Sequence, residues 1–236
     1  MYIEDIFNLA VLSDKYDVLS LVQFAYPMKP WNANQEHRGA WALSRPSSSS
    51  LLKRSDPRWL YVAYAFGHEA DFVEQANYLA RSVSIDAEGQ LMTESGQVIE
   101  EGWLPDDLLE RIFEVRHETI TALLAKVGAL LENPPVCQHE EPSCRTSLIG
   151  SFTAELRGVL LVRSNFTLVT PDDIDMSVER LARHLRSIRV LNSSGHNECK
   201  RRFHIVETHE IVAARRSPVT HAHLTHIRHQ ASRYNA

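Results

Sequence analysis

One long amphipathic stretch decides the fold class of this chain. It begins at Pro105 and ends at the adjacent prolines Pro134 and Pro135, and its apolar residues recur every three or four positions: Leu108, Leu109, Ile112, Phe113, Ile120, Leu123, Leu124, Val127 and Leu131. Because an α-helix turns once every 3.6 residues, these side chains share one face over about seven turns. Proline is accepted at the start of a helix and interrupts it further along. A face this wide predicts a long helix packed within a mainly α-helical fold.

Shorter stretches with the same periodicity predict helices along most of the remaining chain. Two short helices are expected within residues 3–25, with a break at Ser13 and Asp14. Asp56 before Pro57 is a typical helix start, because the aspartate side chain accepts hydrogen bonds from free amides. That helix should end at Gly67, followed by one that buries Phe72, Ala76, Leu79, Ala80 and Val83, and by others at about 144–159, 175–188, 204–215 and after Pro218.

Only one segment predicts regular β-structure. Between Ser84 and Ile99, a Glu-Gly pair and a Ser-Gly pair are typical of turns, and they stand beside the apolar pairs Leu91-Met92 and Val98-Ile99. No internal repeat is evident from the order of the residues. The sequence therefore predicts an irregular multi-helix bundle with one small β-hairpin.

Composition narrows the functional classes. Hydrophobic residues make up 44% of the 236 residues, which predicts a packed core and argues against wholesale disorder. The formal charge of −5 disfavours general binding to nucleic acid or to a membrane surface. No apolar run is long enough to span a bilayer, and residues 1–5 do not resemble a signal peptide, so a cytoplasmic or nuclear location is expected. Three cysteines without an export signal do not suggest a disulfide framework.

The cysteines form the most concentrated chemistry of the chain. Cys137 and Cys144 lie seven positions apart in a proline-bounded loop, and His196 and Cys199 follow a second polar loop. Zinc prefers four tetrahedral ligands, and three thiolates with one imidazole are a common structural set. Such a site contributes directly to the free energy of folding. We therefore predict one structural zinc bound by Cys137, Cys144, His196 and Cys199, clasping two loops that lack an apolar core of their own.

Two alternatives stay open for these residues. His139 or His204 could supply the fourth ligand, because each lies within five residues of a cysteine. Alternatively the cysteines are reduced, and one or two of them are simply small buried apolar side chains. A nucleophilic cysteine is disfavoured, because the acidic pair Glu140-Glu141 works against a lowered thiol pKa at Cys137.

The rest of the chain shows no catalytic motif. It contains no GxSxG, GxxxxGK or GxGxxG sequence, so we expect no enzymatic activity and assign no catalytic residue. Glu114 and His117 are expected to be solvated surface residues. Four histidines near the C-terminal end are expected to form a polar helix face: His221, His223, His226 and His229. The short basic runs are also expected to be solvated: Lys200, Arg201 and Arg202, and Arg215 and Arg216.

Several short segments occur in an order that resembles the region after the BTB/POZ domain of filamentous fungal proteins. Leu9-Ala-Val-Leu-Ser-Asp-Lys-Tyr-Asp17 is similar to the LA-x-L-x-DKYD segment near the end of such BTB domains. The following segments share the family order: Trp59-Leu60, Ala65-Phe66-Gly67, Leu109-Glu-Arg-Ile112, Val115-Arg116, a cysteine pair and His196-x-x-Cys199. The resemblance covers about residues 3–200. It departs from the family where the BTB sheet and helices would precede Ile3, and where Arg145 follows the second cysteine in place of an acidic residue.

The resemblance implies a domain plan and a function. Residues 1–30 would be a remnant of the last BTB helices, 31–55 a linker, 56–135 a helical domain with the hairpin, and 136–236 a helical region with the Cys/His cluster. It also favours Cys137, Cys144, His196 and Cys199 as matched positions.

The expected function is a non-enzymatic protein-protein interaction scaffold or adaptor, acting through a protein partner or self-association. The apolar side of residues 1–26 is the expected partner surface, and a cullin-type ligase would bind only if a fuller BTB domain were present. The alternative is a nucleic-acid-associated regulator that uses the Cys/His cluster and the basic C-terminal segments.

Overall fold

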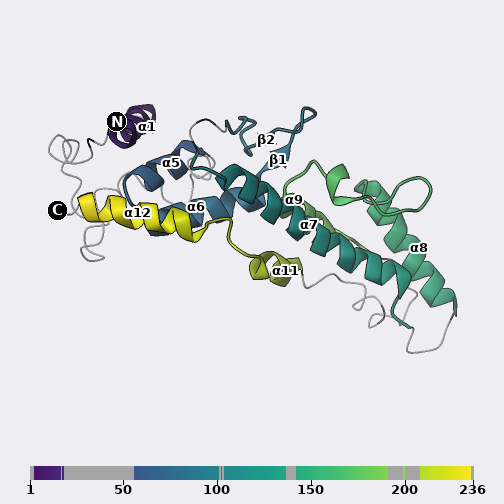
Figure 1. Cartoon of the computed structure of the whole chain (residues 1–236). Helices are drawn as coiled ribbons and strands as arrows, with labels where there is room; N and C mark the ends of the chain where they lie inside the picture. Colours follow the sequence, from purple (N-terminus) through teal and green to yellow (C-terminus); the bar gives the residue numbers. More distant parts are fainter. Residues whose placement is uncertain are drawn as a thin grey trace. The chain divides into compact units, whose positions relative to one another are not determined.

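The computed structural model describes residues 3–16, 18, 56–100, 102, 104–136, 142–190, 199 and 208–234. Within these ranges the chain is mostly α-helical and contains one two-stranded β-hairpin, which confirms the predicted fold class (Figure 1). No helix in the described ranges is both long and apolar enough to cross a membrane. The chain forms two compact units, one within residues 1–83, 87–114 and 217–236 and the other within 84–86 and 115–216.

The first unit contains α1 (Ile3–Tyr16), α5 (Arg58–Ala65), α6 (Glu69–Ser82), the first residues of α7 (Leu108–Glu132) and α12 (His221–Tyr234). α1 packs against α5, and α12 contacts both α5 and α6. A small apolar cluster joins the first two helices: Ile6, Ala10, Tyr61, Val62, Ala65 and Phe66. α5 thus covers part of the apolar side of α1, while Leu12 and Tyr16 remain 50% and 60% exposed. Residues 17 and 19–26 lie outside the described residues, so the predicted partner surface stays a prediction.

The predicted break at Ser13 and Asp14 is wrong, because α1 continues through both residues. The Ser13 hydroxyl donates to the Leu9 carbonyl at 2.7 Å, so its polar group is satisfied inside the helix. Asp14 accepts a hydrogen bond from the Tyr61 hydroxyl at 3.0 Å. Two residues that often end helices are therefore accommodated by a backbone carbonyl and by a partner on α5.

The start of α5 follows the sequence prediction. Asp56 Oδ1 accepts from the Arg58 backbone N–H at 3.0 Å, which is the expected capping interaction. α5 and α6 are joined at Gly67, whose φ of 78° lies in the left-handed region. A Cβ at this position would stand 2.5 Å from the Ala231 backbone nitrogen of α12. Gly67 therefore provides both the turn and the close approach of the two helices.

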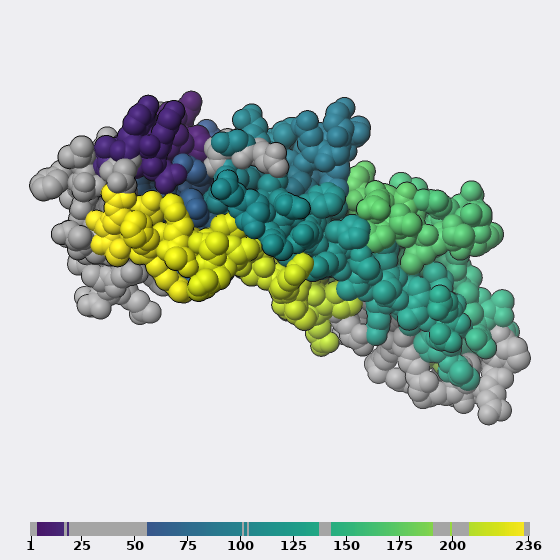
Figure 2. All heavy atoms as spheres, viewed as in Figure 1, coloured from purple at the N-terminus to yellow at the C-terminus, as the bar shows by residue number. Residues whose placement is uncertain are grey.

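The second unit contains the remainder of α7, α8 (Pro142–Gly158), the short 3-10 helix η3 (Pro171–Asp173), α9 (Val178–Ser187) and α11 (Thr208–Ala214). Its core joins apolar faces of α7, α8 and α9. On α8 the buried side chains recur every fourth residue: Cys144, Leu148, Phe152 and Leu156. The segment after α8, in green in Figure 2, lies at the molecular surface in that view.

The two-stranded sheet consists of β1 (Ser84–Ile85) and β2 (Leu91–Met92), and β2 leads into a tight turn. In that turn the Thr93 N–H donates to the Gln97 carbonyl at 2.9 Å, and the Gly96 N–H donates to the Thr93 carbonyl at 3.0 Å. Met92 and Val98 form an isolated antiparallel bridge. Gly96 has a φ of 79°, as glycine often does where such a turn rejoins its strand.

A second turn in the other unit repeats this pattern, which the sequence had not indicated. The Arg163 N–H donates to the Thr167 carbonyl at 2.8 Å, and the Phe166 N–H donates to the Arg163 carbonyl at 2.9 Å. Val162 and Leu168 form the equivalent bridge. Each turn is followed by a Pro-Asp-Asp triplet, at 105–107 and 171–173. The segments 91–99 and 161–169 are therefore two copies of one local structure, and Phe166 stands where the first copy has Gly96.

Candidate functional site

The structure places two members of the predicted zinc set. Cys144 on α8 and Cys199 belong to the same apolar core of the second unit, at 0% and 2% exposure. Cys137 and His196 lie outside the described residues, as do the alternative ligands His139 and His204. Among the residues that are described, no three His, Cys, Asp or Glu side chains gather closely enough to hold a metal ion. The zinc site therefore stays a prediction, with half of its ligand set located in one core.

The histidines of α12 do not form the expected polar face, because two of the four point inward. His223 is buried, and its Nδ1 accepts from the Thr220 backbone N–H at 3.1 Å. That hydrogen bond requires an unprotonated Nδ1, so Nε2 carries the proton and lies 3.0 Å from the Asp106 carbonyl and 2.9 Å from Asp107 Oδ1. His223 thus caps the start of α12 and connects it to the residues before α7.

His226 belongs to a small network that connects α1, α5 and α12. Its ring stacks on Tyr64 with centroids 4.2 Å apart and planes 4° apart, and its Nε2 lies 3.8 Å from Asp14 Oδ1. Burial raises the pKa of Tyr64 to about 12 and, together with Asp14, raises the pKa of Tyr61 above its usual range. Burial lowers the pKa of His226. At neutral pH the network holds two protonated phenols and an uncharged imidazole, which suits helix packing rather than catalysis.

Three residues that the sequence analysis expected at the surface, Glu114, His117 and Arg216, each have a partner of opposite charge or a carboxylate beside them. Glu114 accepts from Arg111 at 3.1 Å, and His117 Nε2 lies 3.3 Å from Asp172 Oδ1. Arg216 is ion-paired with Glu118 at 2.6 Å. Lys200, Arg201 and Arg202 lie outside the described residues. The described part of the basic C-terminal segment therefore gives no specific support to phosphate binding.

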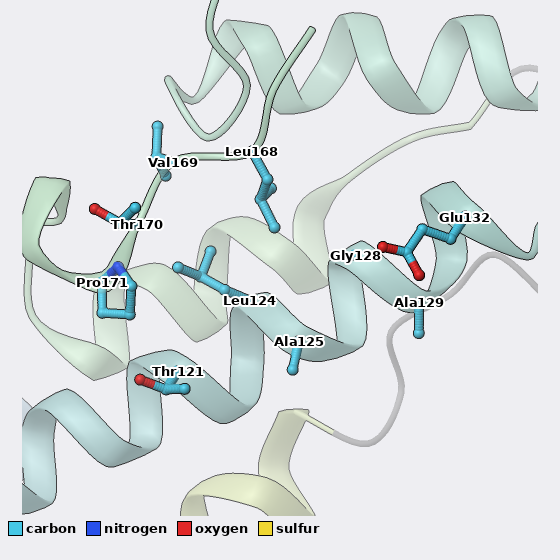
Figure 3. A pocket seen from close by; sticks show the side chains of 10 residues that line it. All are labelled: Thr121, Leu124, Ala125, Gly128, Ala129, Glu132, Leu168, Val169, Thr170 and Pro171. Carbon is cyan, nitrogen blue, oxygen red and sulfur yellow. The ribbon is translucent and has the colours of Figure 1, made fainter.

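A shallow hollow of about 490 Å³ opens in the second unit, between α7 and the segment after the second turn (Figure 3). Its lining consists of Thr121, Leu124, Ala125, Gly128, Ala129, Glu132, Leu168, Val169, Thr170 and Pro171. Glu132 is the single ionisable side chain in this lining, so the hollow contains neither a carboxylate pair nor a His-carboxylate pair. Its chemistry suits contact with an apolar group.

The second turn carries the most exposed aromatic side chain on the described surface. Phe166 is 66% exposed, and nearby Leu160 is 80% exposed. Both have left-handed backbones, with φ of 65° and 61°. The guanidinium carbon of Arg157 lies 5.2 Å from the Phe166 ring centroid, a cation-π contact. The exposed turn surface, as we call it, consists of Arg157 at the end of α8 and of Leu160 and Phe166 in the segment that follows.

Sequence reasoning missed this surface because its turn lacks the glycine that marks the first turn. The first turn is marked by Ser95-Gly96, whereas Asn165-Phe166 contains no glycine at the left-handed position. Asn165 gives the missing support, since its Oδ1 accepts from the Thr167 N–H at 3.2 Å. The Pro-Asp-Asp triplet shared by the two turns was the one signal that could have revealed it.

Comparison with known proteins gives no further assignment. No protein-family model matches the sequence, and no curated protein or solved structure matches it either.

Proposed function

We propose that this chain is a non-enzymatic protein-protein interaction module, the role implied by its resemblance to the region after fungal BTB domains, and that the exposed turn surface contacts the partner. The observation that carries the proposal is the side chain of Phe166. Two thirds of this side chain is exposed to solvent. Its backbone adopts a left-handed conformation that glycine accepts without strain.

The folded chain gains little from this arrangement. A non-glycine residue in the left-handed region costs roughly 1–2 kcal/mol. A phenylalanine that stays mostly in water recovers only part of the roughly 1.5–3 kcal/mol that full burial of such a side chain contributes. The equivalent turn uses Gly96 and avoids the cost. Local strain without a matching gain in packing indicates a residue kept for a contact outside the chain.

The composition of the surface fits a protein partner. Aromatic side chains and arginine are enriched at the centres of protein interfaces, where they bury large areas and donate hydrogen bonds. Phe166 and Arg157 are already held together, so binding would order few additional side chains. The hollow beside Leu168 adjoins the same hairpin and adds apolar area for the partner.

The substitution Phe166→Gly tests the proposal on stability first. We expect its free energy of unfolding to be unchanged or raised by about 1 kcal/mol, because relief of strain outweighs the added freedom of the unfolded chain. The matched control is Gly96→Phe, which introduces the strain at the equivalent position and should lower stability. Urea unfolding monitored by circular dichroism measures both. A clear loss of stability in Phe166→Gly would mean that the ring serves folding, and would overturn the proposal.

Binding is tested by site-specific photo-cross-linking. A benzophenone amino acid in place of Phe166 should give a discrete cross-linked protein species in extracts of the source cells, and the same probe in place of Ser95 should not. The species should disappear when Arg157→Ala and Leu160→Ser are combined with the probe. Equal labelling from both positions, or labelling that survives the double substitution, would contradict a specific interface.

A further inference from the structure

α9 has two faces of opposite character. Its apolar side lies in the core of the second unit through Val178, Leu181, Ala182 and Leu185. The exposed side carries arginine at every third position, and one more follows the helix: Arg180, Arg183, Arg186 and Arg189. Glu179 is the only acidic residue among residues 178–190. We call these four residues the arginine face.

The arginine face carries four positive charges that no carboxylate among the described residues neutralises. Five exposed or half-exposed arginines elsewhere form ion pairs, namely Arg58 with Asp56, Arg111 with Asp107 and Glu114, Arg163 with Asp173, Arg216 with Glu118 and Arg228 with Glu69. None of the four residues of the arginine face has an ion pair with a described residue, and Arg186 donates only to the Ala182 carbonyl. Four positive charges within ten residues repel one another unless an anionic partner approaches.

A segment of complementary charge lies in the same chain. Between Arg81 and Arg111 there is no lysine or arginine, while eight carboxylates occur: Asp86, Glu88, Glu94, Glu100, Glu101, Asp106, Asp107 and Glu110. Glu94, Glu100 and Glu110 are exposed. Residues 88–110 of this segment surround the first turn and belong to the first unit. A protein with formal charge −5 thus concentrates negative and positive charge in separate segments.

These observations favour a carboxylate partner over the other polyanions. The apolar side of α9 is buried, so the helix cannot insert into a lipid surface. The net negative charge opposes long-range attraction to nucleic acid. All four basic residues are arginine, whose planar guanidinium forms bidentate hydrogen bonds with carboxylates. We propose that the arginine face of one copy binds the acidic segment 88–110 of a second copy, so that the chain self-associates through complementary charge.

Sedimentation velocity of the full chain tests this proposal at low and high salt. We expect an associated species at roughly 0.05 M sodium chloride that dissociates at roughly 0.5 M, because exposed charges are screened beyond a Debye length. The double substitution Arg183→Glu with Arg186→Glu should weaken association at low salt by at least about tenfold. The matched control Arg145→Glu changes an exposed arginine on α8 that has no ion pair with a described residue, and it should leave association unchanged.

Charge exchange then identifies the acidic segment. Glu94→Arg with Glu100→Arg should weaken association to a similar degree. Mixing this variant with the Arg183→Glu, Arg186→Glu protein should restore association as a heterodimer. Phe166→Gly should associate like the unmodified chain, which separates this proposal from the exposed turn surface. Circular dichroism confirms that each variant is folded.

Three results would overturn the proposal. The first is an unmodified chain that stays monomeric at low salt. The second is association that survives the Arg183, Arg186 substitutions in a folded protein. The third is a monomer that binds a short DNA duplex only when the arginine face is intact, since the surface would then recognise phosphate.

Discussion

Some ionisable side chains of this protein are buried, where the charged form is disfavoured, and His68 is the clearest case. It stands just before the first residue of α6 and is 9% exposed. Burial lowers the pKa of His68 to about 4. In the unfolded chain the imidazole has a pKa near 6.5. Between these values the unfolded chain binds a proton that the folded chain does not.

The free energy of unfolding should therefore rise with pH between about 4 and 6.5. We expect the protein to be about 2 kcal/mol less stable at pH 5 than at pH 7 on account of His68, with His226 acting in the same direction because burial also lowers its pKa. Urea titrations at the two pH values measure the difference. His68→Gln should flatten the profile and His229→Gln, at an exposed position, should not; a slope unchanged by His68→Gln would assign it to other groups.

Arg116 shows how one residue can join elements that the sequence separates. It is 1% exposed on α7, and its Nη2 donates to the carbonyls of Ile174 at 2.6 Å and Met176 at 2.9 Å. Burial lowers the pKa of Arg116 to about 10, so the guanidinium remains charged at neutral pH. Both acceptors lie in the short connection between η3 and α9. The side chain therefore fixes where α9 begins.

Arg116→Met should remove both hydrogen bonds while keeping a similar apolar length. We expect a loss of about 2–4 kcal/mol in the free energy of unfolding, because two carbonyls lose a charged donor inside the core. Arg111→Met on the same helix removes only exposed ion pairs and should change stability little. Equal effects of the two substitutions in urea unfolding would contradict this role of Arg116.

At the level of elements, periodicity predicted the helices well. The long helix begins three residues after Pro105 and ends two residues before Pro134. α6, α8, α9, α11 and α12 also lie at or near their predicted positions. The errors arose where side chains override local propensity: Ser13 and Asp14 are satisfied within and beside α1, and Phe166 occupies a glycine-like conformation supported by Asn165. Tertiary contacts decide such positions, and residue order does not reveal them.

The candidate sites were less predictable than the helices. The inward position of His223 depends on a hydrogen bond from Thr220 and on Asp106, which lies more than a hundred residues away. The spacing of the arginines within 178–189 places them on one face of a helix. Whether carboxylates lie close enough to pair with them depends on the three-dimensional structure. Spacing identifies which face a residue occupies, whereas its partners require the fold.

At the scale of the whole molecule, the predicted zinc is decided by metal analysis of protein purified without a histidine tag. A structural site should give about one zinc per chain, released by a chelator together with a fall in the unfolding temperature. Cys144→Ala should abolish the zinc content. A metal-free protein whose unfolding temperature is unchanged by the chelator would establish Cys144 and Cys199 as reduced core residues, which their burial in one apolar cluster also allows.

The position of α12 also has a consequence for the order in which the protein is made. The helix that contacts α5 and α6 is the last described one to leave the ribosome, whereas residues 84–86 and 115–216 of the second unit precede it. At about 5–20 residues per second, the interval between residues 83 and 221 lasts on the order of ten seconds. During that interval the surface around Gly67 that receives Ala231 has no helix against it. The second unit can thus complete its core before α12 is synthesised, while the first unit must await that helix.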